Sequence, residues 1–111
     1  MTAISTHVLD TARGLPAGGM AMLLEIRSED GTWAPLGEAA SDADGRATLP
    51  GGPLRRGTYR LTFRTAAYFE TRRVEAFYPE IQVVFEVRDP SRRHHVPLLL
   101  SPWGYSTYRG S

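Results

Sequence analysis

The chain has 111 residues, no cysteine and a formal net charge of +1, and 41% of its residues are hydrophobic. This length allows one domain with one core, so we expect a single domain over residues 1–111. The charge balance argues against a nucleic-acid-binding protein, and no apolar run is long enough to cross a membrane. The lack of cysteine excludes thiolate chemistry and favours a cytoplasmic location.

Most of the chain alternates polar and apolar residues with the two-residue period of a β-strand. Gly- and Pro-rich turns separate these stretches, and many short strands of this kind predict an all-β sandwich. The only predicted helix covers residues 66–73, where Tyr68, Phe69 and Arg72 can pack on a sheet. In chain order, we predict strands at residues 4–9, 20–26, 33–39, 45–49, 58–64, 81–87, 95–100 and 105–109.

The last predicted strand is rich in aromatic residues and threonine, whereas a disordered tail would be polar. We therefore expect Ser111 to lie in folded structure, with its hydroxyl and a terminal carboxylate near the guanidinium of Arg109. Such a group of polar atoms suggests a site.

Strand parity separates the three histidines. His94 shares a face with Val96 and with two leucines further along, which form the better core face, so His95 is predicted to point away from the core. The same argument predicts that His7 points outward from the first strand. If a second subunit covered this face, both side chains would line a pocket between subunits.

His7 and His95 are the only well-placed general acid or base candidates that titrate near neutrality, although isolated histidines are more often structural. Arg46 follows a tight turn, and this segment alone predicts a surface arginine. The arginine pair at residues 92–93 is likewise expected to be solvated surface. We find no serine nucleophile elbow, no dinucleotide fingerprint and no set of metal ligands, and the absence of lysine excludes Schiff-base chemistry.

Six segments of the chain carry a further signal: ISTHVLDT at 4–11, GLPA at 14–17, DGR at 44–46, FYPEI at 77–81, HVPLLLSP at 95–102 and YRGS at 108–111. Taken together, these segments resemble the transthyretin-related family, which includes a hydrolase of 5-hydroxyisourate and the hormone carrier transthyretin. The resemblance covers nearly the whole chain. One departure is His94, where an aromatic residue is common.

The resemblance implies a transthyretin-like β-sandwich of two four-stranded sheets with one short helix, assembled as a homotetramer, a dimer of dimers. It also implies hydrolysis of 5-hydroxyisourate to 2-oxo-4-hydroxy-4-carboxy-5-ureidoimidazoline, a step of urate degradation, without a cofactor or metal. By the family's motif positions, the catalytic residues would be His7, Arg46, His95 and Ser111. The substrate-binding residues would be His7, Arg46, Tyr108 and Arg109.

The sequence does not decide whether His7 or His95 activates water. A non-enzymatic carrier on the same fold is the alternative function, since a fold does not fix a function. A carrier's channel should be lined by apolar and hydroxyl residues, and the terminal tetrapeptide YRGS favours the hydrolase. A structural sandwich of the immunoglobulin type gives no reason for these residues to coincide.

Overall fold

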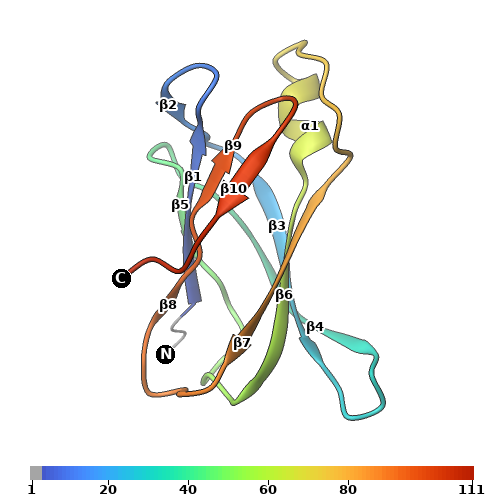
Figure 1. Cartoon of the computed structure of the whole chain (residues 1–111), viewed down its shortest axis with the longest axis vertical. Helices are drawn as coiled ribbons and strands as arrows, with labels where there is room; N and C mark the ends of the chain where they lie inside the picture. Colours follow the sequence, from blue (N-terminus) through green and yellow to red (C-terminus); the bar gives the residue numbers. More distant parts are fainter. Residues whose placement is uncertain (1–3) are drawn as a thin grey trace.

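Alternation of buried and exposed side chains along the strands produces two facing β-sheets (Figure 1). The computed structural model describes residues 4–111, and within this range the elements are ten strands and one short helix. The predicted all-β sandwich is confirmed. One sheet carries the candidate site on its outer face, and the other closes the core behind it.

The first sheet is centred on β1 (Ile4–Asp10), whose alternating pattern buries every second side chain. Two short strands follow one another along each flank of β1, and a further strand lies beyond one flank, so the sheet is four strands wide, as expected. The parallel flank is formed by β8 (His94–His95) and β9 (Leu98–Leu100), with β10 (Tyr105–Thr107) beyond it, and the antiparallel flank by β5 (Arg46–Thr48) and β2 (Leu15–Pro16).

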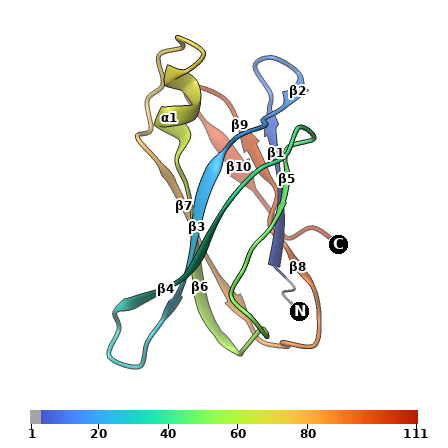
Figure 2. The ribbon, with the colours of Figure 1, turned by 180° about the vertical axis from the view of Figure 1, so that it is seen from behind.

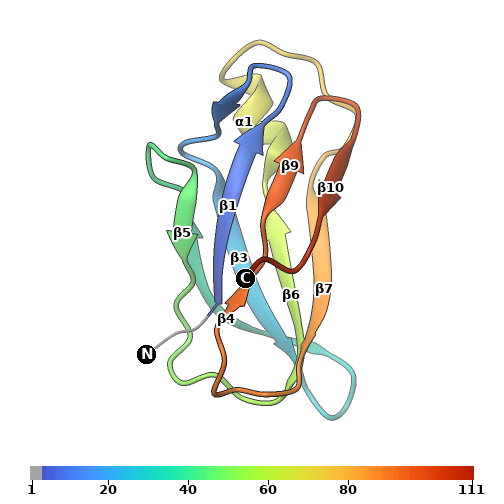
Figure 3. The same cartoon turned by 60° about the vertical axis from the view of Figure 1, so that its left-hand side comes forward.

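The second sheet is fully antiparallel, in the order β4-β3-β6-β7. Figure 3 shows it behind the first sheet, and buried side chains of both sheets form one core cluster. Its strands are β3 (Ala21–Arg27), β4 (Trp33–Ala40), β6 (Gly57–Phe63) and β7 (Ile81–Val87).

The core contains the side chains that the period-two pattern assigns to it. The predicted face of Met20, Met22, Leu24 and Ile26 is buried, as are large residues of β6 and β9. Helix α1 (Thr65–Glu70) adds the buried rings of Tyr68 and Phe69 at one end of the sandwich. The Tyr68 hydroxyl donates a 2.9 Å hydrogen bond to the buried Asp10 carboxylate, which ties the helix to β1.

β2 is not among the predicted strands, and three predicted elements differ from the structure by more than one residue. The strand expected at 95–100 is split, because Pro97 has no N–H to donate to a ladder. The helix ends at Glu70, and the following turn includes Arg73 with a positive φ of 57°, which is incompatible with a continuing helix. The final strand ends at Thr107, after which the chain crosses beside β8, as Figure 2 shows from behind.

Candidate active site

Polar side chains gather on the outer face of the first sheet, where three strands meet. Ser5 of β1 is flanked by His95 on one side and Thr48 on the other, and His7 of β1 lies opposite Arg46. Directly paired residues of neighbouring strands project to the same face of a sheet. The register therefore places both outward histidines and Arg46 on one surface.

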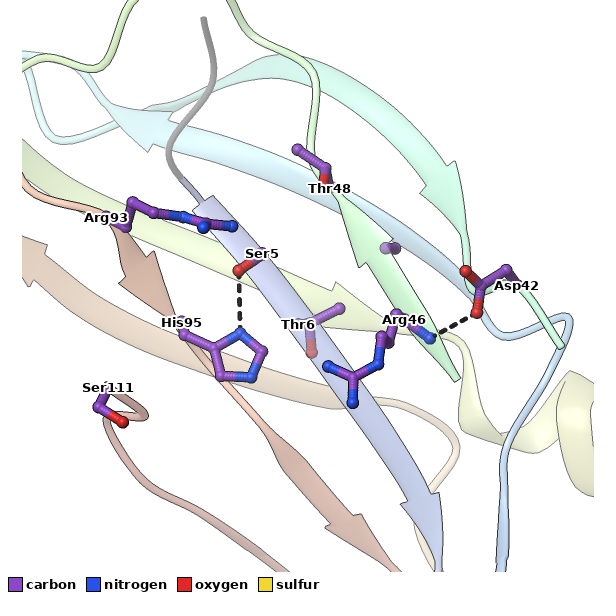
Figure 4. A pocket seen from close by; sticks show the side chains of 9 residues that line it. Ser5, Thr6, Asp42, Arg46, Thr48, Arg93, His95 and Ser111 are labelled. Atoms are coloured by element: carbon purple, nitrogen blue, oxygen red, sulfur yellow. Dashed lines mark hydrogen bonds between the residues drawn. The ribbon is translucent and has the colours of Figure 1, made fainter. Parts of the chain in front are cut away.

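A pocket of about 610 Å³ lies on this surface (Figure 4). Of the predicted site residues, it brings together Arg46, His95 and Ser111. His7 lies on the same face but does not line the pocket, because its imidazole Nε2–H donates a 2.9 Å hydrogen bond to the carbonyl of Asp44. The lining residues are Ser5, Thr6, Asp42, Arg46, Ala47, Thr48, Arg93, His95 and Ser111.

His95 is a half-buried imidazole held from one side. A 2.9 Å hydrogen bond joins its Nδ1 to the hydroxyl of Ser5, so Nε2 is the ring nitrogen left for other partners. Partial burial, followed by the positive charges of His7, Arg46 and Arg93, lowers the pKa of His95 below its ordinary value of 6.5. His95 is therefore neutral near pH 7, the state in which an imidazole can accept a proton.

His94 faces the opposite way, as parity predicts. Its side chain is only 5% exposed and lies on the core face with Val96. Its Nδ1–H donates a 2.9 Å hydrogen bond to the carbonyl of Arg92, which leaves it outside the pocket.

The turn before β5 positions Arg46. One carboxylate oxygen of Asp42 accepts 2.9 Å hydrogen bonds from the backbone N–H groups of Asp44 and Arg46. Gly45 has a φ of +78°, and a β-carbon at this position would collide with the carbonyl oxygen of Val8. The guanidinium of Arg46 lies over β1 on the side of His95 (Figure 4), and it makes no hydrogen bond or ion pair with residues 4–111.

The end of the chain reaches the pocket through one backbone contact. The N–H of Gly110 donates a 2.8 Å hydrogen bond to the carbonyl of His95, which places Ser111 at the pocket. Tyr108 and Arg109 do not line this pocket. They line a separate cavity of about 230 Å³, together with residues of β7 and with His94, His95, Val96 and Thr107.

Six of the nine lining residues are not among the predicted site residues, and Ser5 and Arg93 matter most for the chemistry. Ser5 was not singled out, although its parity equals that of His7. Arg93 was interpreted as solvated surface; it is exposed, but it also lines the pocket. Its parity equals that of His95, two residues further on, and this signal was sufficient to place it on the outer face.

Within residues 4–111, no three histidine, aspartate or glutamate side chains are grouped as metal ligands. The helix of this same range is too short to span a membrane.

The fold and the site define a class of protein: a two-sheet β-sandwich that carries an imidazole and guanidinium pocket on the outer face of one sheet. A model of the HIUase/Transthyretin family matches residues 4–110, and the chain belongs to this family.

The similar proteins include both 5-hydroxyisourate hydrolases and a transthyretin. A Caenorhabditis elegans protein named "Probable 5-hydroxyisourate hydrolase" is 48% identical over 110 residues, which cover 97% of this chain and 81% of the relative. The structure of 5-hydroxyisourate hydrolase from Klebsiella pneumoniae superposes with a TM-score of 0.87 at 36% identity, covering all of both chains. Sea bream transthyretin in complex with thyroxine superposes with a TM-score of 0.91 at 29% identity, covering 97% of this chain and 94% of its own.

Both structures share the fold closely, so the fold does not distinguish hydrolase from carrier. The pocket must make that distinction.

Proposed function

We propose that this chain hydrolyses 5-hydroxyisourate in urate degradation, as the names of its relatives indicate for those proteins. The observation that carries the proposal is the imidazole of His95 in a pocket shared with Arg46 and Ser111: its Nδ1 is bonded to Ser5, and its Nε2 has no hydrogen-bond partner within residues 4–111. A base for water and a cation for a developing oxyanion are the two groups that this hydrolysis needs.

His95, rather than His7, is the better candidate for the base. When its Nδ1–H donates to the hydroxyl of Ser5, the lone pair of Nε2 is free to accept a proton from water. His7 does not line the pocket, and its Nε2–H is held by the Asp44 carbonyl. We assign His7 to substrate positioning at the edge of the pocket.

In the proposed reaction, water loses a proton to Nε2 of His95, and its oxygen adds to a ring carbonyl carbon. The carbonyl oxygen becomes an oxyanion beside the guanidinium of Arg46. The C–N bond of the ring then breaks, the leaving nitrogen takes the proton from the imidazolium, and the carbonyl carbon becomes a carboxylic acid that ionises. The product is 2-oxo-4-hydroxy-4-carboxy-5-ureidoimidazoline. No group is oxidised or reduced.

We further propose that the enzyme is a homotetramer, a dimer of dimers, in the cytoplasm. The support is that Leu9 and Leu99 are half-buried on the same outer face as the histidines. A second subunit over this face would enclose the pocket. It would also account for the family's use of Tyr108 and Arg109, which line a separate cavity within one chain.

A spectroscopic assay tests the function directly. 5-Hydroxyisourate is generated in place by oxidation of urate, and its decay is followed with and without the protein. We expect the protein to accelerate the decay, and His95→Ala or Arg46→Ala to lower turnover by about 100-fold or more. His94→Ala is the matched control, because its side chain faces the core, and it should keep most of the activity. Decay at the spontaneous rate with wild-type protein, or an inactive His94→Ala beside an active His95→Ala, would contradict the proposal.

The carrier alternative predicts a different pocket. A binding site for an aromatic hormone is expected to be apolar with a few polar groups, whereas two arginines and a histidine line this one. Titration calorimetry with thyroxine separates the two functions: a carrier binds it tightly, and a hydrolase with this pocket does not.

A further inference from the structure

Two arginines line the pocket from opposite flanks of β1. Arg46 comes from β5 on the antiparallel flank, and Arg93 immediately precedes β8 on the parallel flank. Figure 4 shows the guanidinium of Arg93 over Ser5, at the end of the pocket away from Asp42. His95, bonded to Ser5, therefore lies on the same flank as Arg93, whereas Arg46 starts from the opposite flank and its guanidinium reaches over β1 toward His95.

The guanidinium of Arg93 is available to a ligand. Within residues 4–111 it makes no hydrogen bond and no ion pair, whereas Arg60 pairs with Glu25 at 2.8 Å. The acidic side chain of the pocket, Asp42, is at the far end, and one of its oxygens already accepts two backbone N–H groups. An uncommitted guanidinium beside a neutral imidazole is suited to bind a carboxylate.

We propose that Arg93 binds the carboxylate group that forms when the ring C–N bond is cleaved, an inference that rests on the proposed function. This carboxylate has two oxygens. One was the carbonyl oxygen, which the mechanism places beside Arg46. The other is delivered by the water that His95 activates, and it emerges on the flank of Arg93. The two guanidinium groups thus hold one oxygen each, and Arg93 makes the pocket selective for flat rings that carry an anionic substituent.

The charge of Arg93 has a second, measurable effect. It contributes, after burial and together with His7 and Arg46, to the lowered pKa of His95, and Asp42 is the opposing negative side chain of the pocket. Removing this charge raises the pKa of His95, so the acidic limb of the pH–rate profile moves to higher pH. A role in packing alone would not move it.

The test compares the variants Arg93→Gln and Arg92→Gln. The probes are orotate, a flat ring that carries a carboxylate, and uracil, a flat ring without one. Arg92 is the matched control because it is the neighbouring residue and carries the same charge, but it lines a different cavity with Asp89 and His94. Inhibition of hydrolysis and calorimetric binding are both measured. We expect Arg93→Gln to weaken orotate binding by about tenfold, the size of one charge-assisted hydrogen bond, with uracil unaffected.

Arg93→Gln should also move the acidic limb of the pH–rate profile to higher pH. Arg93→Lys should leave the limb in place, because it keeps the charge. Arg92→Gln should match wild type both in orotate binding and in the pH–rate profile. The proposal is overturned if orotate binds wild type no better than uracil, or if Arg92→Gln has the same effect as Arg93→Gln. When either result is found while wild type hydrolyses 5-hydroxyisourate and His95→Ala does not, only the role of Arg93 is rejected, and the proposed function stands. If wild type is inactive, the proposed function itself fails.

Discussion

The hydroxyl of Ser5 and the charges around His95 prepare this imidazole for acid-base chemistry before any substrate arrives. Burial and the positive charges of His7, Arg46 and Arg93 disfavour the imidazolium, so the pKa of His95 lies below 6.5. The base form consequently persists to lower pH than in an ordinary histidine. We expect the acidic limb of kcat/KM against pH to fall below pH 6.5. A limb above that value would show that the imidazole is not neutralised in this way.

Gly110 is needed at its position because it packs against the catalytic candidate. A β-carbon there would lie 2.5 Å from Cδ2 of His95, a distance that forces the imidazole to move. We expect Gly110→Ala to lower kcat by about tenfold or more, since small displacements of a catalytic group are costly, while the melting temperature changes little. The control is Gly104→Ala, whose β-carbon would meet only the hydroxyl of Ser101 at 3.8 Å. Equal activity of both variants would contradict this role.

At the scale of elements, the turn that precedes β5 positions Arg46 so that it lines the pocket. Asp42 fixes this turn through two backbone N–H groups, one of them that of Arg46. We expect Asp42→Ala to destabilise the fold by about 1–2 kcal/mol and to lower kcat/KM, because the backbone of Arg46 is then no longer held in place by the Asp42 carboxylate. Asp42→Asn retains an acceptor oxygen and should restore most of both quantities in thermal unfolding and turnover assays. If Asp42→Asn were as impaired as Asp42→Ala, the carboxylate charge rather than the turn would be the cause.

The segment after β10 is the second element that the site depends on. Residues 108–111 are largely exposed and contribute no side chain to the core, yet Gly110 bonds to the backbone of His95 and Ser111 lines the pocket. We expect deletion of Tyr108–Ser111 to leave a folded protein, as judged by circular dichroism, with activity reduced by about 100-fold or more. Full activity in the folded, truncated protein would remove the strongest argument for a hydrolase over a carrier.

At the scale of the whole molecule, the pocket lies on an open sheet face rather than between the two sheets. Half-buried Leu9 and Leu99 continue this face beyond His7 and His95, and such a surface is suited to cover by a second copy. We expect light scattering at micromolar concentration to give four times the 12.3 kDa mass of the chain. A monomer mass for the active protein would show that one chain forms the complete site.

Much of the architecture could be predicted from the local pattern of polar and apolar residues in the sequence. Alternation predicted the strands, the buried methionine and leucine face and the opposite orientations of His94 and His95, because side chains of a strand alternate between two faces regardless of what lies beside it. The segments ISTHVLDT, HVPLLLSP and YRGS indicated the family, which the family match over residues 4–110 confirms. Local pattern did not predict where the strand at Pro97 is interrupted or where the helix before Arg73 ends, since both depend on backbone hydrogen bonds that the period does not contain.

What the sequence by itself determined is therefore which face each residue occupies and which family the chain resembles. Only the tertiary structure decided which residues meet on that face. Ser5 and His95 are 90 positions apart and become bonded neighbours through the parallel pairing of β1 with β8, and Arg46 joins them through the antiparallel pairing of β5. The physical reason is that strand register is set by backbone hydrogen bonds and by the packing of the whole core, which no single segment encodes.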